Sequence, residues 1–117
     1  MSSQVVRDII IDDQNNKWIG TEYYMSVLDQ SNLLWSEHVE MYNLPPPHDS
    51  INPVVDIEID SYGRIWTAVY VGYLGEGGIA YFSGGQWQDY HVSDGLIGPN
   101  VKDIAIDSQN NVWVATS

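Results

Sequence analysis

One segment of this chain is written three times, and this repetition constrains the fold more than any other feature. The copies occupy residues 5–23, 54–70 and 101–117. Asp, Ile and Trp return at matching places in each copy, with a period of about 47 residues. A period of this length indicates a supersecondary unit that buries its apolar face only against neighbouring units.

Each copy has the pattern of two short strands joined by a tight turn. Isoleucines such as Ile9 and Ile11 alternate with other residues, which is the period of two expected for a strand. The turn that follows has Asn15, Gly63 and Asn110 at one position, and both residue types tolerate positive φ, so a hairpin is predicted. The polar residues beside the turn are interpreted as turn caps, because they lack the later Glu of a calcium loop: Asp12, Asn16, Asp107 and Asn111.

A weaker repeat follows, in which residues 27–35 align with residues 79–87 and both end in Trp. Residues 82–87 have the pattern of a strand, a Gly-rich turn and a strand. One unit is therefore four short antiparallel strands, which is the blade of a β-propeller. We expect an all-β propeller segment over residues 1–117, with blades at about 5–44 and 54–96 and a half blade at about 101–117. The repeated tryptophans are expected to pack between blades: Trp18, Trp66 and Trp113.

Residues 94–117, DGLIGPNVKDIAIDSQNNVWVATS, closely resemble the two-component regulator propeller repeat. The earlier copies match through Asp12 with residues 18–21, and through Asp60, Gly63 and Trp66. The resemblance implies a periplasmic or exported sensor domain of a hybrid histidine kinase, often responding to glycans, or a scaffold in an exported protein. It implies recognition and no conserved catalytic set. Departures from the pattern are Asn15 and Asn110 for Gly, Val69 for Thr, and Asn43-Leu44 for Asp-Gly-Leu.

Composition narrows the expected partners. Sixteen acidic residues against four basic ones give a net charge of −12, which repels nucleic acid and anionic membranes. Neutral or cationic ligands, including sugars, remain open. The absence of Cys excludes disulfide and thiolate chemistry, and we expect no cofactor and no metal. No apolar run reaches the length of a membrane span, and the start MSSQVVRD has no signal-peptide pattern, so the sequence leaves the localisation open.

Two connections differ in length between the copies. Residues 69–79 form a longer link between the second and third strands than residues 21–27, and residues 44–56 exceed residues 96–103 between blades. Both longer connections would emerge on one face of a propeller, where grafted binding sites are expected. Tyrosines beside carboxylates and amides suit sugar rings. The predicted ligand-binding residues are Tyr23, Tyr24, His48, Asp49, Asn52, Tyr70, Tyr73 and Glu76. In the alternative interpretation, the tyrosines pack the loops and the Pro-rich stretch is a stiff connector.

Three functions are compatible with these features of the sequence. The first is a non-enzymatic recognition module that binds a saccharide or another small molecule, and the second is a self-assembling interaction scaffold without such a ligand. The third is an enzyme like streptogramin lyase, which would need a general base close to its substrate. His38 and His91 are expected on outer strands facing solvent, and only His48 lies in a loop at the mouth. We therefore expect no enzyme and assign no catalytic residue.

Association with further copies is also expected. A propeller needs at least four blades to close, so two and a half blades leave Trp-bearing faces uncovered. Two chains would supply enough strands for about five four-stranded blades, which makes a homodimer the smallest integral solution. Both leftover hairpins would be first-and-second-strand pairs, so they would have to pair unconventionally. A homodimer or a higher oligomer is the predicted assembly, with further sequence as the other way to close the ring.

Overall fold

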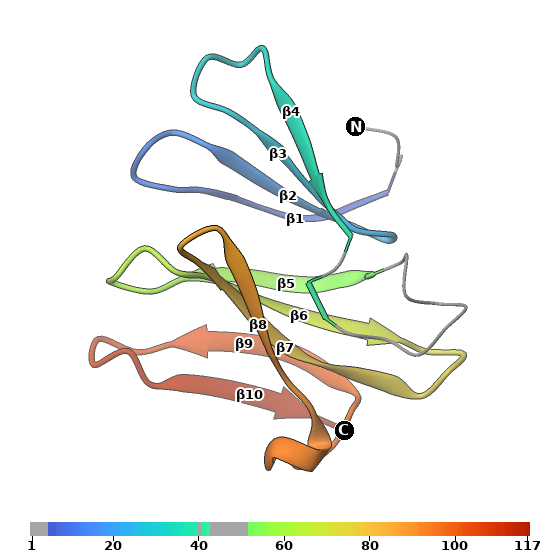
Figure 1. The fold of residues 1–117 in the computed structure, drawn as a ribbon. Helices are drawn as coiled ribbons and strands as arrows, with labels where there is room; N and C mark the ends of the chain where they lie inside the picture. Colours follow the sequence, from blue (N-terminus) through green and yellow to red (C-terminus); the bar gives the residue numbers. More distant parts are fainter. Residues whose placement is uncertain (1–4, 40, 43–51) are drawn as a thin grey trace.

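A computed structural model describes residues 5–39, 41–42 and 52–117. Three antiparallel sheets follow one another in chain order (Figure 1). The first comprises β1 (Val6–Ile11), β2 (Lys17–Thr21), β3 (Met25–Leu28) and β4 (Trp35–His38). The second comprises β5 (Val54–Ile59), β6 (Ile65–Val71), β7 (Glu76–Ser83) and β8 (Gln86–Tyr90). A short 3₁₀ turn (Val92–Asp94) then leads to the hairpin of β9 (Val101–Ile106) and β10 (Val112–Thr116).

The sheets are stacked as successive propeller blades. In each sheet the strands are neighbours in chain order, and the first strands are neighbours across sheets, because β5 packs against both β1 and β9. This arrangement confirms the predicted all-β propeller fold, with two four-stranded blades and a two-stranded third unit. The described residues hold no helix long and apolar enough to cross a membrane.

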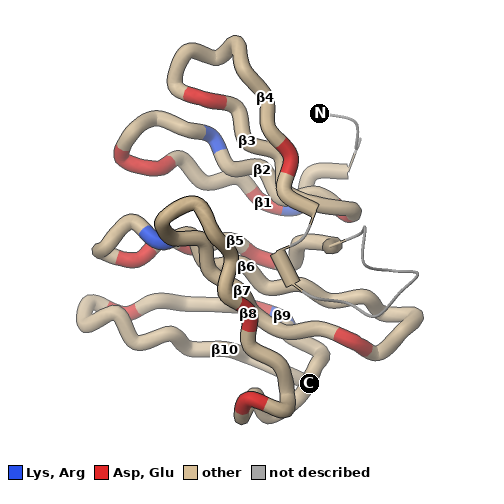
Figure 2. Tube along the Cα trace, in the orientation of Figure 1, with Lys and Arg blue, Asp and Glu red and all other residues tan. Residues whose placement is uncertain are grey.

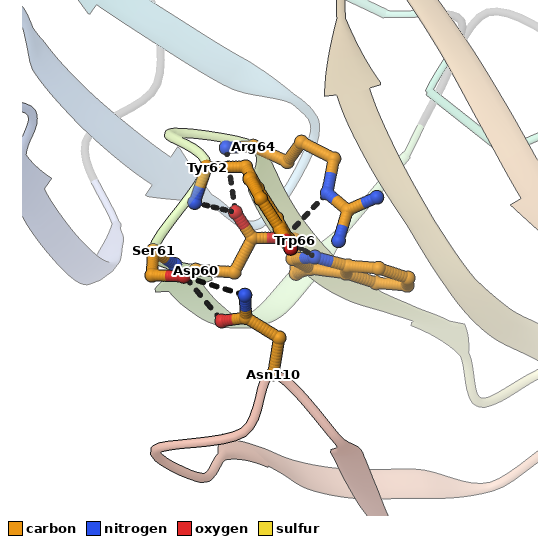
Figure 3. Close-up of polar contacts among 6 residues, drawn as sticks. All are labelled: Asp60, Ser61, Tyr62, Arg64, Trp66 and Asn110. Atoms are coloured by element: carbon orange, nitrogen blue, oxygen red, sulfur yellow. Dashed lines mark hydrogen bonds and ion pairs between the residues drawn. The ribbon is translucent and has the colours of Figure 1, made fainter.

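An aspartate caps the turn between the first two strands of every blade. In the second blade, Asp60 accepts hydrogen bonds from the backbone N–H groups of Tyr62 and Arg64, and from Trp66 Nε1 at 3.0 Å (Figure 3). Burial would raise the pKa of Asp60, but the hydrogen bonds from Trp66 and Arg64 outweigh it and lower the pKa. The turn-cap interpretation is therefore confirmed. The same Asp–Trp bond joins Asp12 to Trp18 and Asp107 to Trp113.

The turn residues adopt the predicted backbone conformation. Asn15, Gly63 and Asn110 have φ of 63°, 81° and 62°. Glycine and asparagine are the residues that enter this left-handed region at the lowest cost, so the choice at this repeated position has a conformational cause.

The core lies between the blades. Trp18 packs against Phe82 and Trp87 of the second blade, with ring centroids 5.5 and 6.4 Å apart. Trp66 is buried in a second cluster that includes Ile104 of the third unit. Trp18 and Trp66 therefore pack between blades as expected, whereas Trp113 is 65% exposed.

The predicted alignment of the third strands is wrong by two residues. Trp18 pairs with Val27, while Trp66 pairs with Tyr81, so Val27 corresponds to Tyr81 and not to Ile79. The reason is the hairpin that follows. Residues 29–34 connect β3 to β4, whereas residues 84–85 alone connect β7 to β8, and the tryptophan after each hairpin concealed this difference.

The longer connection in the second blade is mostly strand. β6 and β7 extend past their first-blade counterparts, and Tyr70 pairs with Gly77 and Val71 with Glu76. Only residues 72–75 remain as the turn. The inserted residues therefore lengthen a hairpin, and its tip lies at the same end of the sheet as the start of β5 (Figure 1).

Candidate functional site

A cavity of about 300 Å³ lies where the first strands of the three blades begin. It is on the face to which the sequence assigned the longer connections. Strand starts, the end of β6 and two basic side chains form its wall. The lining residues are Arg7, Pro53, Val54, Val55, Tyr70, Gly72, Asn100, Val101 and Lys102.

The two basic residues sit at β-bulges. The register of β1 against β2 shifts between Val6 and Asp8, and the same irregularity on β9 skips Lys102. A bulge residue is left out of the ladder and its side chain is re-aimed. Val55 occupies the equivalent place on β5, so Arg7, Val55 and Lys102 form a row across the three first strands.

The cavity contains two basic side chains, although the chain as a whole is strongly acidic. Arg7 and Lys102 are two of only four basic residues in a chain with sixteen acidic ones. Figure 2 shows acidic segments on all three sheets and few basic ones. Across residues 5–39, 41–42 and 52–117 the ion pairs are Arg64 with Asp60 and His91 with Asp89, so neither cation of the cavity forms an ion pair there.

Asn100 also lines this cavity. Its Nδ2 donates a hydrogen bond to Ser117 Oγ. Its Oδ1 is buried and has no hydrogen-bond partner within the described part of the chain. A buried amide oxygen without a partner carries a free-energy penalty.

The structure brings one of the predicted ligand-binding residues to the cavity. Tyr70 lines the cavity. Tyr23 and Tyr73 are 52% and 71% exposed, and Glu76 is exposed at the start of β7, but none of these three lines the cavity. Tyr24 is buried, with 8% of its surface exposed. His48 and Asp49 lie outside the described residues.

Asn52, also predicted to bind ligand, is fully buried. Its Oδ1 accepts a hydrogen bond from the backbone N–H of Tyr42 at 2.6 Å, and its Nδ2 donates to the Tyr42 carbonyl at 3.1 Å. Its own backbone N–H donates to the Tyr23 carbonyl. The side chain therefore ties Tyr42, which follows β4, to the segment that leads into β5.

A row of aspartates follows the bulges on the first strands. The backbone N–H of Ile57 donates to Asp8 Oδ2 at 2.9 Å, and that of Ile104 donates to Asp56 Oδ2 at 3.0 Å. Each of these carboxylates thus binds the first strand of the next blade. Burial, with hydrogen bonds to Asp103 and Asp8, raises the pKa of Asp56 to about 8. No group of three His, Asp or Glu side chains in the described ranges is placed to hold a metal ion.

We expect the melting temperature to rise as the pH is lowered from about 8 to about 5. The Asp56 pKa of about 8 in the folded protein lies above the ordinary value of 3.8, so the folded state keeps a proton that the unfolded chain has lost. The stability from this group is therefore lost progressively as the pH rises from the ordinary pKa of 3.8 to about 8. Asp56→Asn, which mimics the protonated carboxyl, should flatten the dependence. Calorimetry on both proteins measures it, and an unchanged dependence in the variant would contradict this assignment.

A larger cavity, of about 500 Å³, lies between β4 and the β7–β8 hairpin. His38 is one of its polar lining residues, but His38 Nδ1 already accepts a hydrogen bond from Trp87 Nε1 at 3.1 Å. The ring also packs against Trp18 and Phe82, and burial lowers its pKa. The expectation that His38 faces solvent is therefore wrong, because the end of β4 turns toward the second blade. Because the His38 ring is already held by Trp87, Trp18 and Phe82, this cavity is the weaker candidate for a binding site.

His91 also departs from the expectation of a solvent-facing side chain. It follows β8, and its ring lies 4.2 Å from the ring of Tyr42. Its Nε2 is 2.8 Å from Asp89 Oδ2. Neither of these two histidines is among the residues that line the cavity with the basic side chains.

Sequence reasoning misses Arg7, Asn100 and Lys102. A signal for two of them exists, because the residue before each repeated aspartate varies as Arg, Val and Lys within an otherwise constant Val-x-Asp-Ile. Variation at one place of a repeat indicates a position that is free to take up function. Nothing in the pattern around Asn100 reveals its buried oxygen.

Comparison with known families bears on the third unit. Residues 95–117 match the family described as two component regulator propeller. The matched segment contains β9 and β10, and it confirms the resemblance drawn from the sequence. No curated protein matches the chain.

Proposed function

We propose that this chain, which carries a two component regulator propeller repeat, is a non-enzymatic recognition module. Its cavity of about 300 Å³ beside Arg7 and Lys102 would bind a small anionic, polyhydroxylated molecule such as an acidic saccharide. The repeat supports a propeller module of the kind found in two-component regulators. The observation that carries the ligand class is the presence of Arg7 and Lys102, unpaired within the described residues, in one cavity of a strongly acidic chain.

The wall offers complementary groups for such a ligand. The Arg7 guanidinium can bind a carboxylate through two parallel hydrogen bonds, and Lys102 adds a second positive charge. The Tyr70 ring can pack against the C–H groups of a sugar. A volume of about 300 Å³ is at the lower end for ligand pockets, which suits one or two sugar rings.

We propose binding without turnover at this cavity. General acid–base catalysis uses a side chain within hydrogen-bond reach of the substrate, most often His and also Asp, Glu, Lys or Tyr. The described lining holds no His, Asp or Glu, and we assign its Lys102 and Tyr70 to ligand binding. A protein scaffold without a small-molecule ligand is the alternative function, and it predicts that no saccharide binds in the cavity.

A matched pair of disaccharides tests the proposal. Cellobiouronic acid and cellobiose differ at one carbon, which is a carboxylate in the first and a hydroxymethyl group in the second. We expect the acid to bind at least about tenfold more tightly, and added salt to weaken it. Isothermal titration calorimetry, with amide chemical shifts to locate the site, measures both affinities.

Variants assign the effect to the cavity. The double variant Arg7→Gln with Lys102→Gln should lose the preference for the acid. Lys17→Gln should retain it, because Lys17 lies on β2 and bonds Asn32 outside the cavity. Equal affinity for the two disaccharides, or equal losses in the double variant and Lys17→Gln, would refute the ligand class.

The tyrosines separate this cavity from the wider predicted face. Tyr70→Ala should weaken binding of cellobiouronic acid about tenfold, because the ring forms part of the wall. Tyr73→Ala should leave the affinity unchanged, since Tyr73 is exposed on the neighbouring turn. The reverse order of effects would place the site at the hairpin tip.

A further inference from the structure

The blade interfaces inside the chain use the same apolar residues each time. Val54 and Ile57 of the second blade are 0% and 2% exposed, because they pack against the first blade. Val101 and Ile104, at the equivalent places on β9, are each 1% exposed. The first blade has the same residue types on β1, but there they are exposed. We call this surface the leading face, and it comprises Val6 (43%), Ile9 (55%) and Ile11 (57%).

The opposite side of each blade receives these residues. A Cβ at Gly20 of the first blade would overlap Val54 Cγ1, and Ala68 of the second blade is fully buried in the cluster that contains Ile104. Ala115 is the counterpart of Gly20 and Ala68 on β10, but it is exposed. It borders a cavity of about 260 Å³. We call this surface the trailing face, and it comprises Asp103, Ala105, Trp113, Val114 and Ala115.

The aspartate row continues onto both faces. Within the chain, each aspartate accepts the backbone N–H of the isoleucine on the next first strand. Asp103 is the next member of the row on the trailing face. The matching donor on the leading face is the N–H of Ile9, whose hydrogen bond within the described residues goes to Asp8 beside it. The trailing face therefore carries the acceptor, and the leading face the donor, of one further hydrogen bond of this kind.

A polar contact between turns supports the same pairing. Asn110 Oδ1 accepts the backbone N–H of Ser61 at 3.0 Å, and Asn110 Nδ2 donates to Ser61 Oγ (Figure 3). The equivalent of Ser61 in the third unit is Ser108, and the equivalent of Asn110 in the first is Asn15. Asn15 has the same left-handed φ as Asn110. Gly63 at this place in the second blade has no side chain, so the second blade cannot make this contact with the first. The two open faces carry both partners, Ser108 on the trailing face and Asn15 on the leading face.

We propose that the trailing face of this chain binds the leading face of a second copy, head to tail. Val6 and Ile9 of one copy would occupy the cavity beside Ala115 and Trp113 of the other, and Asn15 would bind Ser108. Two copies joined in this way at both ends would form a ring of six sheets, within the range of four to eight blades. Head-to-tail contacts that close in this way form rings.

Solution mass measures the first consequence. The full chain should sediment as a dimer at micromolar concentration and dissociate on dilution. Ile9→Asp on the leading face and Ala115→Arg on the trailing face should each weaken association about a hundredfold, because each buries a charge in an apolar contact. Leu33→Asp is the control, since Leu33 is 78% exposed on the β3–β4 hairpin and away from both faces.

Mixing the two variants tests the head-to-tail arrangement itself. Ile9→Asp keeps an intact trailing face, and Ala115→Arg keeps an intact leading face. An equimolar mixture should form a dimer of one chain of each kind, whereas either variant alone stays monomeric. Because each substituted residue is exposed, near-ultraviolet circular dichroism should show an unchanged fold.

Three outcomes would overturn the proposal. The first is a wild-type chain that stays monomeric at 100 µM, and the second is a dimer that Ile9→Asp does not weaken. The third is a mixture of the two variants that fails to associate while each is folded, because an interface that pairs identical surfaces would not be restored by mixing. Longer assemblies that both variants disrupt would uphold the contact and overturn the closed ring of two.

Discussion

Replacing Asp60 with alanine is expected to lower the free energy of unfolding by about 3 kcal/mol. The side chain of Asp60 is inaccessible to solvent and accepts hydrogen bonds from two backbone N–H groups, Arg64 Nε and Trp66 Nε1. Alanine leaves these donors without an acceptor. Removing one partner from buried polar groups costs the desolvation of those that remain.

The third unit supplies a matched control for this substitution. Asp107 accepts the same set of backbone bonds and the bond from Trp113 Nε1, but there the cap is open to solvent. Water can replace the lost carboxylate at Asp107, so Asp107→Ala should destabilise the protein less than Asp60→Ala. Urea unfolding followed by tryptophan fluorescence compares the two substitutions in the Ile9→Asp background, in which the chain is expected to be monomeric and Trp113 exposed. Equal losses would show that burial by the neighbouring blade does not matter.

Asn52→Ala is expected to have the second large effect, also about 3 kcal/mol. The side chain is fully buried and satisfies both the N–H and the carbonyl of Tyr42. Alanine would leave two buried backbone groups unpaired and would open a small cavity.

Tyr73→Ala is the control for Asn52→Ala, because the sequence places both residues in the candidate binding face. Tyr73 is 71% exposed, so we expect its removal to change the free energy of unfolding by no more than about 0.5 kcal/mol. Thermal unfolding of the two variants measures the difference. A stable Asn52→Ala protein would show that the bonds to Tyr42 contribute little to the fold.

The architecture could be predicted because each repeated residue has one dominant physical role. Asn15, Gly63 and Asn110 recur where the chain needs positive φ, and the buried tryptophans recur where one blade meets the next. Such roles depend on local backbone geometry and on period, which a single sequence displays directly. Repetition therefore identified the blades without any knowledge of their partners.

The errors arise where two hairpins differ in length at constant sequence spacing. Aligning Val27 with Ile79 kept the distance to the next Trp equal, but the β3–β4 connection is longer and the β6–β7 hairpin is extended. Sequence alone does not separate inserted strand residues from inserted loop residues. His38 was misplaced for a related reason, because its contact with Trp87 depends on how two blades face each other.

The candidate site could be located to a face but not to its residues. Tyr70 was identified from the longer connection, whereas Arg7 and Lys102 reach the cavity through β-bulges. A bulge moves one side chain out of strict alternation, so the period-two pattern of a strand does not predict which way that side chain points. The buried oxygen of Asn100 depends on the packing around it, which no spacing in the sequence reveals.

The central claim is that the three sheets are consecutive blades packed through their first strands. Nuclear Overhauser spectroscopy on the labelled protein tests it most directly, through contacts between Gly20 and Val54 and between the rings of Trp18 and Phe82. We predict strong cross-peaks for both pairs, because each pair spans the first two blades. Strong cross-peaks within each sheet together with none for these two pairs would contradict the account.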